Sequence, residues 1–336
     1  MPIDRPSQQP FPVTKGRYTM RPGMREFGRA AFGMPAEFGH FRLDQTTPRY
    51  LQAKLNSRQS YPDSALRLAD SVDADRLMQV VWRTLNTLGE EEPAWLEWSE
   101  DRIILPLIGV HVHRGDELEL STYPAPLADL GKAIAKQCQM QTGVRRWLEV
   151  LGLVVPCDFA MMASATENQV SRDHCEAMHV CFPSSWAPRM KVGRDFAEIH
   201  RPVANNETIL KGSANLVHAM CFMGPYVRYA WGMHRHGGLD SNPDHQPERI
   251  DMSGWSPDQV AAQTWFRVER QTTKPFPDLE RGLFTIRTFV EPLVEVAKDR
   301  EKAQQLAAAI RSMNPASLRY KGLIDRKDAL LAYLDD

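Results

Sequence analysis

Two β-prone segments in the last third of the chain constrain the fold most. Residues 264–276 (TWFRVERQTTKPF) and 282–290 (GLFTIRTFV) are rich in β-branched and aromatic residues, which favour strands. Only a short connection separates them, and it contains Pro277 and Asp278, which are typical turn residues. Strands joined so closely pair in antiparallel fashion. The sequence therefore predicts an antiparallel strand pair.

Helical patterns accompany these strands, and the mixture predicts a single α+β domain with helical extensions. Residues 66–88 have apolar side chains at helical spacing, and Asp73 is a plausible N-cap of the second part. Residues 103–113 predict a strand interrupted at Pro106, and the polar segment 164–173 predicts a loop. Further helices are expected at 127–140, 208–222, 292–313 and within 316–334, and further strands at 153–162, 178–182 and 226–233.

Composition divides the chain into three parts. Residues 1–63 are rich in Pro, Gly and Arg and predict an irregular N-terminal arm that lies over the domain. Residues 64–314 contain the predicted sheet and most of its helices. Residues 315–336 predict a C-terminal helical extension.

The charge balance excludes several classes of partner. The chain has 41 Lys and Arg and 42 Asp and Glu residues, for a formal net charge of -1, so nothing indicates binding to nucleic acid or an acidic membrane. Five cysteines without a C-x-x-C spacing argue against a disulfide framework or a structural zinc site. The chain has no apolar stretch near the ~18 residues of a membrane helix and no apolar export signal. We expect a cytoplasmic protein.

The segment 181–203 (CFPSSWAPRMKVGRDFAEIHRPV) combines residue types that suit a binding site. Its three prolines exclude one continuous helix, because each lacks a backbone donor and restricts the preceding residue. His200 comes just before the corner at Pro202, so the chain sets its backbone direction. That position suits a metal ligand or a base, and it also suits an ordinary buried histidine.

Two other groups of histidines are weaker candidates for a metal site. His111 and His113 share one face of the predicted strand, for which a solvated face is the favoured interpretation. The second group lies in a polar loop, which is a common solvent-facing insertion. It consists of His234, His236 and His245 with Asp240, Asp244 and Glu248.

Two charged residues lie in apolar surroundings. Asp158 comes at the end of an apolar run, where a carboxylate would be costly to bury without a partner, so a functional aspartate and an exposed strand end are equally favoured. Arg228 lies between Tyr226 and Tyr229, where a guanidinium either pairs with an acid or faces a cavity.

The chain resembles the haem-dependent oxidative N-demethylase family, at its α subunit. The most specific matches are FPSSW-x-P-x-x-K-V-G-R-x-x-x-x-I-H-x-P-V (182–203), the arginine-aromatic strand 227–231 and FRVERQTTKPFP…GLFTIRTFVEPL (266–293). Weaker matches include YLQAKLNSR (50–58), CDF (157–159) and YKG (320–322).

The resemblance implies a PAS-like antiparallel sheet that encloses a b-type haem. It also implies an O2-dependent monooxygenase that removes a methyl group from a small secondary amine such as dimethylamine. Electrons would come from NAD(P)H through a reductase, by way of flavin and iron-sulfur carriers on partner subunits. Carried over residue by residue, His200 corresponds to the axial iron ligand.

The resemblance also implies roles for residues around that histidine. Lys191, Arg194 and Arg201 are candidates to pair with the haem propionates, which need cationic partners. Arg228 corresponds to an arginine expected on the side of the haem where oxygen binds. Asp158 or Glu198 are candidates to neutralise a substrate ammonium.

The sequence departs from the family pattern at two places. Ala230 replaces the asparagine of the family's Arg-x-Asn-Trp strand, and Cys157 replaces the glutamate before Asp158. Both changes are expected to alter which substrate binds and to leave haem binding intact. A haem-based PAS sensor and a non-haem metal enzyme that uses the His-rich loop are the alternative functions.

Overall fold

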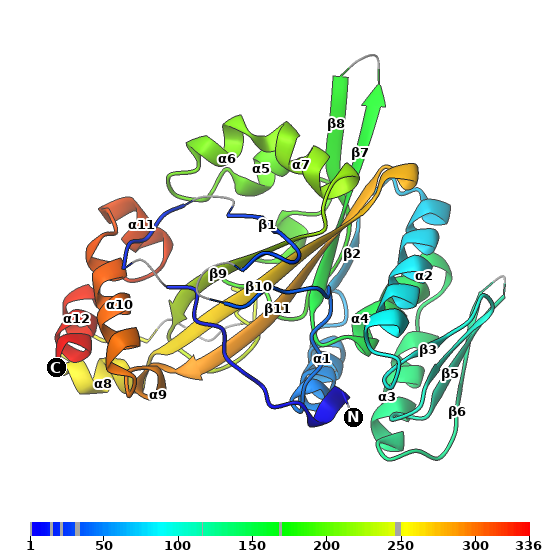
Figure 1. Ribbon diagram of the computed structural model, residues 1–336, viewed down its shortest axis with the longest axis horizontal. Coiled ribbons are helices and arrows are strands. Elements are labelled where there is room, and N and C mark those ends of the chain that lie inside the picture. The colour runs from blue at the N-terminus through cyan, green and yellow to red at the C-terminus, as the bar shows by residue number, and fades with distance from the viewer. Residues whose placement is uncertain are drawn as a thin grey trace.

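The protein, analysed as a computed structural model, contains a large antiparallel sheet (Figure 1). The structure describes residues 2–13, 16–20, 23–30, 34–115, 117–167, 170–245 and 250–336, and between 165 and 172 it describes backbone only. The strand order is β1-β9-β10-β11-β7-β8-β2. The strands are β1 (Arg25–Glu26), β2 (Leu66–Leu68), β7 (Asp158–Glu167), β8 (Val170–His179), β9 (Tyr226–His234), β10 (Trp265–Phe276) and β11 (Arg281–Pro292).

A second, smaller antiparallel sheet and the helices pack around the large sheet. The small sheet has the order β3-β4-β5-β6, with β3 (Glu97–Trp98), β4 (Arg102–Leu105), β5 (Val110–Arg114) and β6 (Leu118–Thr122). The longer helices are α1 (Thr47–Ser60), α2 (Ala74–Glu91), α3 (Ala128–Gln139), α4 (Gly143–Val154), α7 (Ser213–Phe222), α10 (Arg300–Arg311) and α12 (Lys327–Asp335). The shorter ones are η1 (Pro2–Asp4), η2 (Pro188–Met190), α5 (Phe196–His200), α6 (Glu207–Lys211), α8 (Pro257–Ala262), η3 (Pro277–Leu279), α9 (Leu293–Val296) and α11 (Pro315–Tyr320).

The register of the large sheet assigns side chains to its two faces. Glu269 on β10 pairs with Ala230 on β9 and with Thr288 on β11, and Gln271 pairs with Arg228. Because side chains alternate along a strand, these residues lie on one face, which we call the site face. Figure 1 shows α5, α6 and α7 on one side of the sheet. Phe284, which alternation places on the site face, packs in a cluster with residues of that helical layer.

The opposite face carries the larger cores. There the N-terminal arm contacts the sheet through the ring pairs Phe11–Phe266 and Tyr18–Trp231, and α10 and α12 supply leucines and alanines to the same core.

On the site face, close packing holds α7 against the sheet. A Cβ at Gly282 of β11 would lie 2.6 Å from the carbonyl oxygen of Met220 in α7. The helical layer therefore has a defined height above the sheet.

The predicted α+β class with an antiparallel sheet is confirmed. The strand pair β10–β11 runs in unbroken register from Trp265↔Pro292 to Phe276↔Arg281. Asp73 caps α2 by accepting a hydrogen bond from Arg76 N at 3.1 Å. The expected strand 103–113, with its interruption at Pro106, forms the two antiparallel strands β4 and β5. The described part of the chain contains no helix with both the length and the apolar character needed to cross a membrane.

Four local predictions were wrong. Residues 47–60 of the expected irregular arm form α1. The buried side of this helix includes the charged residues Lys54 and Arg58, which weaken the apolar periodicity of the sequence. The expected loop 164–173 is instead mostly the paired ends of β7 and β8. The first part of the helix expected at 66–88 is the strand β2. The buried strand expected to begin at 153 begins at Asp158, because α4 continues to Val154.

Candidate functional site

His200 ends the short helix α5, which a capping box starts. The Asp195 side chain accepts from the Glu198 backbone N–H at 2.6 Å, and the Glu198 side chain accepts from the Asp195 backbone N–H at 3.4 Å. His200 Nδ1 lies 2.8 Å from the carbonyl oxygen of Phe196, and its ring stacks on the Phe196 ring at 4.1 Å. Because a carbonyl only accepts, Nδ1 carries the proton and Nε2 keeps a free lone pair.

The electrostatic surroundings keep His200 neutral. Burial, together with the positive charges of Lys191 and Arg228, lowers its pKa to about 4, against the effect of the hydrogen bond to Phe196. At neutral pH the imidazole therefore presents an unprotonated Nε2, the form that binds a metal. Its role as a ligand stays a prediction.

The three cations predicted to meet haem propionates differ in position. Lys191 Nζ lies 4.7 Å from the centre of the Trp186 ring and 3.4 Å from the carbonyl oxygen of Ile199. Burial lowers the pKa of Lys191 to about 8, with Cys175 and Glu269 opposing the shift. Arg194 and Arg201 are exposed. Of the three, Lys191 alone combines burial with electrostatic reach of the site face.

Arg228 lies on the site face of β9, with its Nε atom buried and lacking a hydrogen-bond partner among the described residues. Burial lowers the pKa of Arg228, while Glu269, Tyr18 and Tyr320 raise it. The sequence left open whether this arginine pairs with an acid or faces a cavity. The structure shows that Arg228 lies near Glu269 and that its Nε–H group has no hydrogen-bond partner among the described residues.

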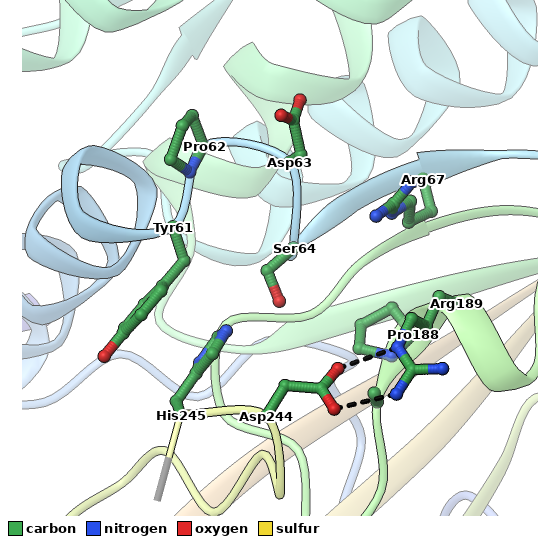
Figure 2. A pocket seen from close by; sticks show the side chains of 10 residues that line it. Tyr61, Pro62, Asp63, Ser64, Arg67, Pro188, Arg189, Asp244 and His245 are labelled. Carbon is green, nitrogen blue, oxygen red and sulfur yellow. Dashed lines mark hydrogen bonds and ion pairs between the residues drawn. The ribbon is translucent and has the colours of Figure 1, made fainter.

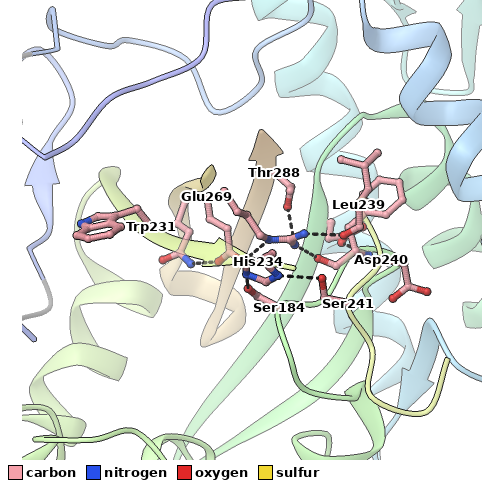
Figure 3. A network of polar contacts seen from close by, with 12 residues as sticks. Ser184, Trp231, His234, Leu239, Asp240, Ser241, Glu269 and Thr288 are labelled. Carbon is pink, nitrogen blue, oxygen red and sulfur yellow. Dashed lines mark hydrogen bonds and ion pairs between the residues drawn. The ribbon is translucent and has the colours of Figure 1, made fainter. Parts of the chain in front are cut away.

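Glu269 is the central acid of the site face, and the sequence analysis missed it (Figure 3). Gln271 Nε2 donates to Glu269 Oε2 at 2.9 Å, and Arg267 Nε lies 3.6 Å from Glu269 Oε1. Arg267 is held in turn by donating to the carbonyl oxygens of Leu239 and Phe182, each at 2.6 Å. The signal was present in the alternation of polar residues along β10, but a charged residue inside a strand is ordinarily assigned to a solvated face.

Both ends of the chain contribute to the surroundings of Arg228. Lys321, which follows α11, donates from Nζ to the carbonyl oxygen of Trp231 at 2.7 Å. Burial lowers the pKa of Lys321 to about 8, with Glu269 opposing the shift and Arg228 adding to it. Tyr18, from the N-terminal arm, has a buried hydroxyl without a partner among the described residues. Burial and the neighbouring Tyr320 raise the pKa of Tyr18 well above its ordinary value, while Arg228 opposes the shift.

Of the two acids predicted to meet a substrate ammonium, Asp158 lies on the site face, because it pairs with Ile286 of β11, which in turn pairs with Gln271. Asp158 accepts hydrogen bonds from the backbone N–H groups of Cys181 at 3.0 Å and Phe182 at 2.7 Å, and forms an ion pair with Lys54 at 3.3 Å. Both side chains are 0% exposed, so the charge of Asp158 is already matched inside the core. Glu198 is exposed and serves the cap of α5. Contact of either acid with a substrate stays a prediction.

The histidine candidates for a non-haem metal site already have protein partners. His234 lies 3.2 Å from Ser184 Oγ and 3.1 Å from Ser241 Oγ, as Figure 3 shows. His245 Nδ1 lies 2.7 Å from Asp240, and its ring stacks on Tyr61. His111 and His113 lie on β5 of the small sheet, and Glu248 lies outside the described residues.

One group of potential metal ligands exists within the described ranges. Ligand atoms of Asp158, His179 and Cys181 all lie within 4.8 Å of one another. Lys54 forms an ion pair with the Asp158 carboxylate of this group, and burial raises the pKa of the Cys181 thiol well above its ordinary value. A cationic neighbour and a protonated thiol both oppose a metal ion, so the group belongs to the core.

A cavity of about 330 Å³ lies between the end of α1, η2 and the His-rich loop (Figure 2). Arg189 and Asp244 form a two-bond ion pair across its rim, at 2.7 and 2.8 Å. Tyr61 and His245 form its aromatic wall, and Arg67 lines it from β2. The cavity is separate from the site, since its lining does not include His200, Arg228 or Glu269.

Fold and site together define a class: an α+β protein with a neutral, carbonyl-anchored histidine facing a cationic cluster on one face of an antiparallel sheet. The family described as haem-dependent oxidative N-demethylase, alpha subunit-like, matches residues 130–331, which is more than half of the chain. The chain belongs to this family. The description names a haem-dependent oxidoreductase, and "alpha subunit-like" implies further subunits in the family.

The residues present fit a haem. Glu269 already pairs with Arg267, which leaves Lys191, Arg228 and Lys321 without a matching acid in the described site. Buried cations are stable only when they are paired, and the two propionates of a haem supply such charge. His200 supplies a neutral nitrogen, and Arg228 Nε and Gln271 Oε1 are buried on the same face without a hydrogen-bond partner among the described residues.

Proposed function

We propose that this protein uses haem b to catalyse the O2-dependent oxidative N-demethylation of a small secondary amine. The observation that carries the proposal is His200: Nδ1 is anchored on the Phe196 carbonyl at 2.8 Å and burial lowers its pKa to about 4, in a chain of the haem-dependent oxidative N-demethylase family. We also propose that the seven-stranded sheet is the PAS-like sheet of this family and that it would hold the haem together with α5.

In this proposal the chain's own groups hold and orient the reactants. His200 Nε2 would bind the haem iron, and the bond from Nδ1 to Phe196 sets the ring orientation. Lys191 and Lys321 would pair with the propionates, while Arg194 and Arg201 lie exposed at the rim. Arg228 would offer N–H donors to bound oxygen or substrate. The haem, when bound, supplies oxygen activation and electron transfer.

The reaction balances with two electrons and two protons. One atom of O2 enters a C–H bond of the N-methyl group and the other leaves as water. The resulting carbinolamine loses formaldehyde as its C–N bond breaks, and the nitrogen retains the bonding pair and a proton. We propose that the electrons come from NAD(P)H through flavin and iron-sulfur carriers of a partner reductase, which agrees with the "alpha subunit-like" description of the family.

The absorption spectrum of the isolated protein tests the proposal. We expect a Soret band that shifts on reduction with dithionite and again with carbon monoxide. With an added NAD(P)H-dependent reductase and a secondary N-methylamine, formaldehyde should form in proportion to the NAD(P)H consumed. A protein that purifies with stoichiometric zinc or non-haem iron, and does not take up haemin, would refute it. Reversible gas binding without amine-dependent consumption of NAD(P)H would indicate a sensor.

Haem affinity should fall as the pH rises above about 8. The pKa values of Lys191 and Lys321 are lowered to about 8, so both side chains lose their charge, and their attraction for propionates, through this range. The groups that face them are Cys175, Glu269 and Arg194 for Lys191, and Glu269 and Arg228 for Lys321.

Titration of the haem-free protein with haemin between pH 7 and 9.5 measures this dependence. A Lys321→Met variant should bind haemin more weakly at pH 7 and show a shallower pH dependence. Lys298→Met, at an exposed ion pair, is the matched control. An unchanged affinity up to pH 9.5 in the natural protein would show that these lysines do not face the propionates.

A further inference from the structure

We propose that the amine taken by this site also carries an acid group, so that the substrate is an N-methylated amino acid rather than a simple dialkylamine. This inference rests on the proposed function. The charges on the site face exceed those that the two haem propionates would match. Lys191, Arg228 and Lys321 are three cations without a matching acid, and two propionates leave one of them unmatched.

Arg228 is the cation best placed to meet a further anion. Lys321 Nζ is bonded to the Trp231 carbonyl, and Lys191 Nζ lies over Trp186 and near the Ile199 carbonyl. Arg228 has a buried Nε without a partner among the described residues. A guanidinium presents its N–H groups in a planar fork that matches a carboxylate. A dialkylammonium ion would leave this charge unpaired and would be repelled by it.

Glu269 supplies the negative charge for the amine nitrogen, because its 3.6 Å ion pair with Arg267 is not a hydrogen bond and leaves its oxygen atoms able to accept one. Arg228 pairs with Gln271 across the strands and Glu269 pairs with Ala230, so Arg228 and Glu269 are diagonal neighbours on one face. Backbones of such neighbours lie about 7–8 Å apart, and two long side chains can close on a molecule as small as an amino acid. Glu269 is 14% exposed and accepts a hydrogen bond from Gln271, and its two carboxylate oxygens have capacity for more.

The residues of β9 beside this pair are small. Ala230 lies directly opposite Glu269, and Gly232 follows on the same face. A Cβ at Gly232 would lie 3.8 Å from His234 Nε2 and 4.0 Å from Lys321 Nζ. Because Ala230 has no polar side chain, Glu269 has no polar neighbour directly opposite it on β9. An asparagine at 230 would place an amide beside Glu269, where the amine nitrogen is proposed to lie.

Ligand binding to the haem-loaded protein tests the inference without turnover. The probes are N-methylglycine, its methyl ester, which lacks the carboxylate, and dimethylamine, with calorimetry and the shift of the Soret band as readouts. We expect N-methylglycine to bind at least about tenfold more tightly than either of the others, as a charged hydrogen-bonded pair contributes about that factor. Turnover would then give glycine, formaldehyde and water from N-methylglycine, O2, two electrons and two protons.

Two variants locate the recognition. Arg228→Gln should remove the preference for N-methylglycine over its ester. Ala230→Asn should weaken N-methylglycine by a similar factor while the haem spectrum stays unchanged, which guards against a folding defect in the first variant. Arg83→Gln, at an exposed arginine of α2 that pairs with Asp278, is the matched control and should change nothing.

The possible failures are distinct. A protein that takes up no haem refutes the proposed function. A haem-loaded protein that binds dimethylamine or the ester as tightly as N-methylglycine, or binds none of the three, refutes this inference alone.

Discussion

Replacing His200 by alanine is expected to lower the affinity for haemin by about 100-fold or more and to shift the Soret band of any haem that still binds. Loss of residues that merely orient a metal ligand costs 10–100-fold in many sites, and loss of the ligand itself should cost no less. No residue of α5 is fully buried, and the ring of His200 stacks on that of Phe196. The variant should therefore fold. Haemin titration followed by absorption spectroscopy is the measurement.

Two controls separate ligation from packing. His218→Ala removes an exposed histidine that stacks on Phe222 of the neighbouring α7 at 5.0 Å, and it should leave the spectrum unchanged. Added imidazole should restore a His200-like spectrum in His200→Ala, because a free imidazole can enter the space left by the side chain. A His200→Ala protein with the natural Soret band and haemin affinity would exclude His200 as the ligand.

Replacing Lys54 by methionine is expected to lower the free energy of unfolding by about 3–5 kcal/mol, the usual cost of leaving one member of a buried ion pair without its partner. Lys54 and Asp158 lie 3.3 Å apart and both are 0% exposed. Lys54 also donates to the carbonyl oxygens of Gly152, at 2.9 Å, and Cys157. Its removal leaves these buried acceptors unsatisfied as well, which adds to the loss.

Chemical denaturation of the haem-free protein measures this effect. The matched control is Lys298→Met, which breaks an exposed ion pair with Glu295 and should change stability by no more than about 1 kcal/mol. A Lys54→Met protein as stable as the control would show that the pair does not hold the core. If Lys54→Met changes amine affinity at unchanged stability, the original prediction for Asp158, contact with a substrate ammonium, would gain support.

Local patterns predicted much of the fold because the forces that set those elements act over a few residues. The turn at Pro277 and Asp278 between two β-prone runs predicted the β10–β11 pair, which the structure confirms. The Asp73 cap likewise depends on a side chain and a backbone group three positions apart. The helix α1 escaped prediction because Lys54 and Arg58 face the core, and only partners about 100 residues away, such as Asp158 and Glu149, make that burial possible.

The sequence by itself determined the family and singled out His200, since a histidine before a proline corner is a local feature. Tertiary structure alone decided which charges accompany it. Tyr18, Lys191, Glu269 and Lys321 come from four distant segments, and each would look like an ordinary surface residue in isolation. Burial and unmatched charge are properties of the packed molecule, because they depend on every group that excludes water from a site. For the same reason Arg194, Arg201 and Glu198, which are close to His200 in sequence, lie exposed in the structure.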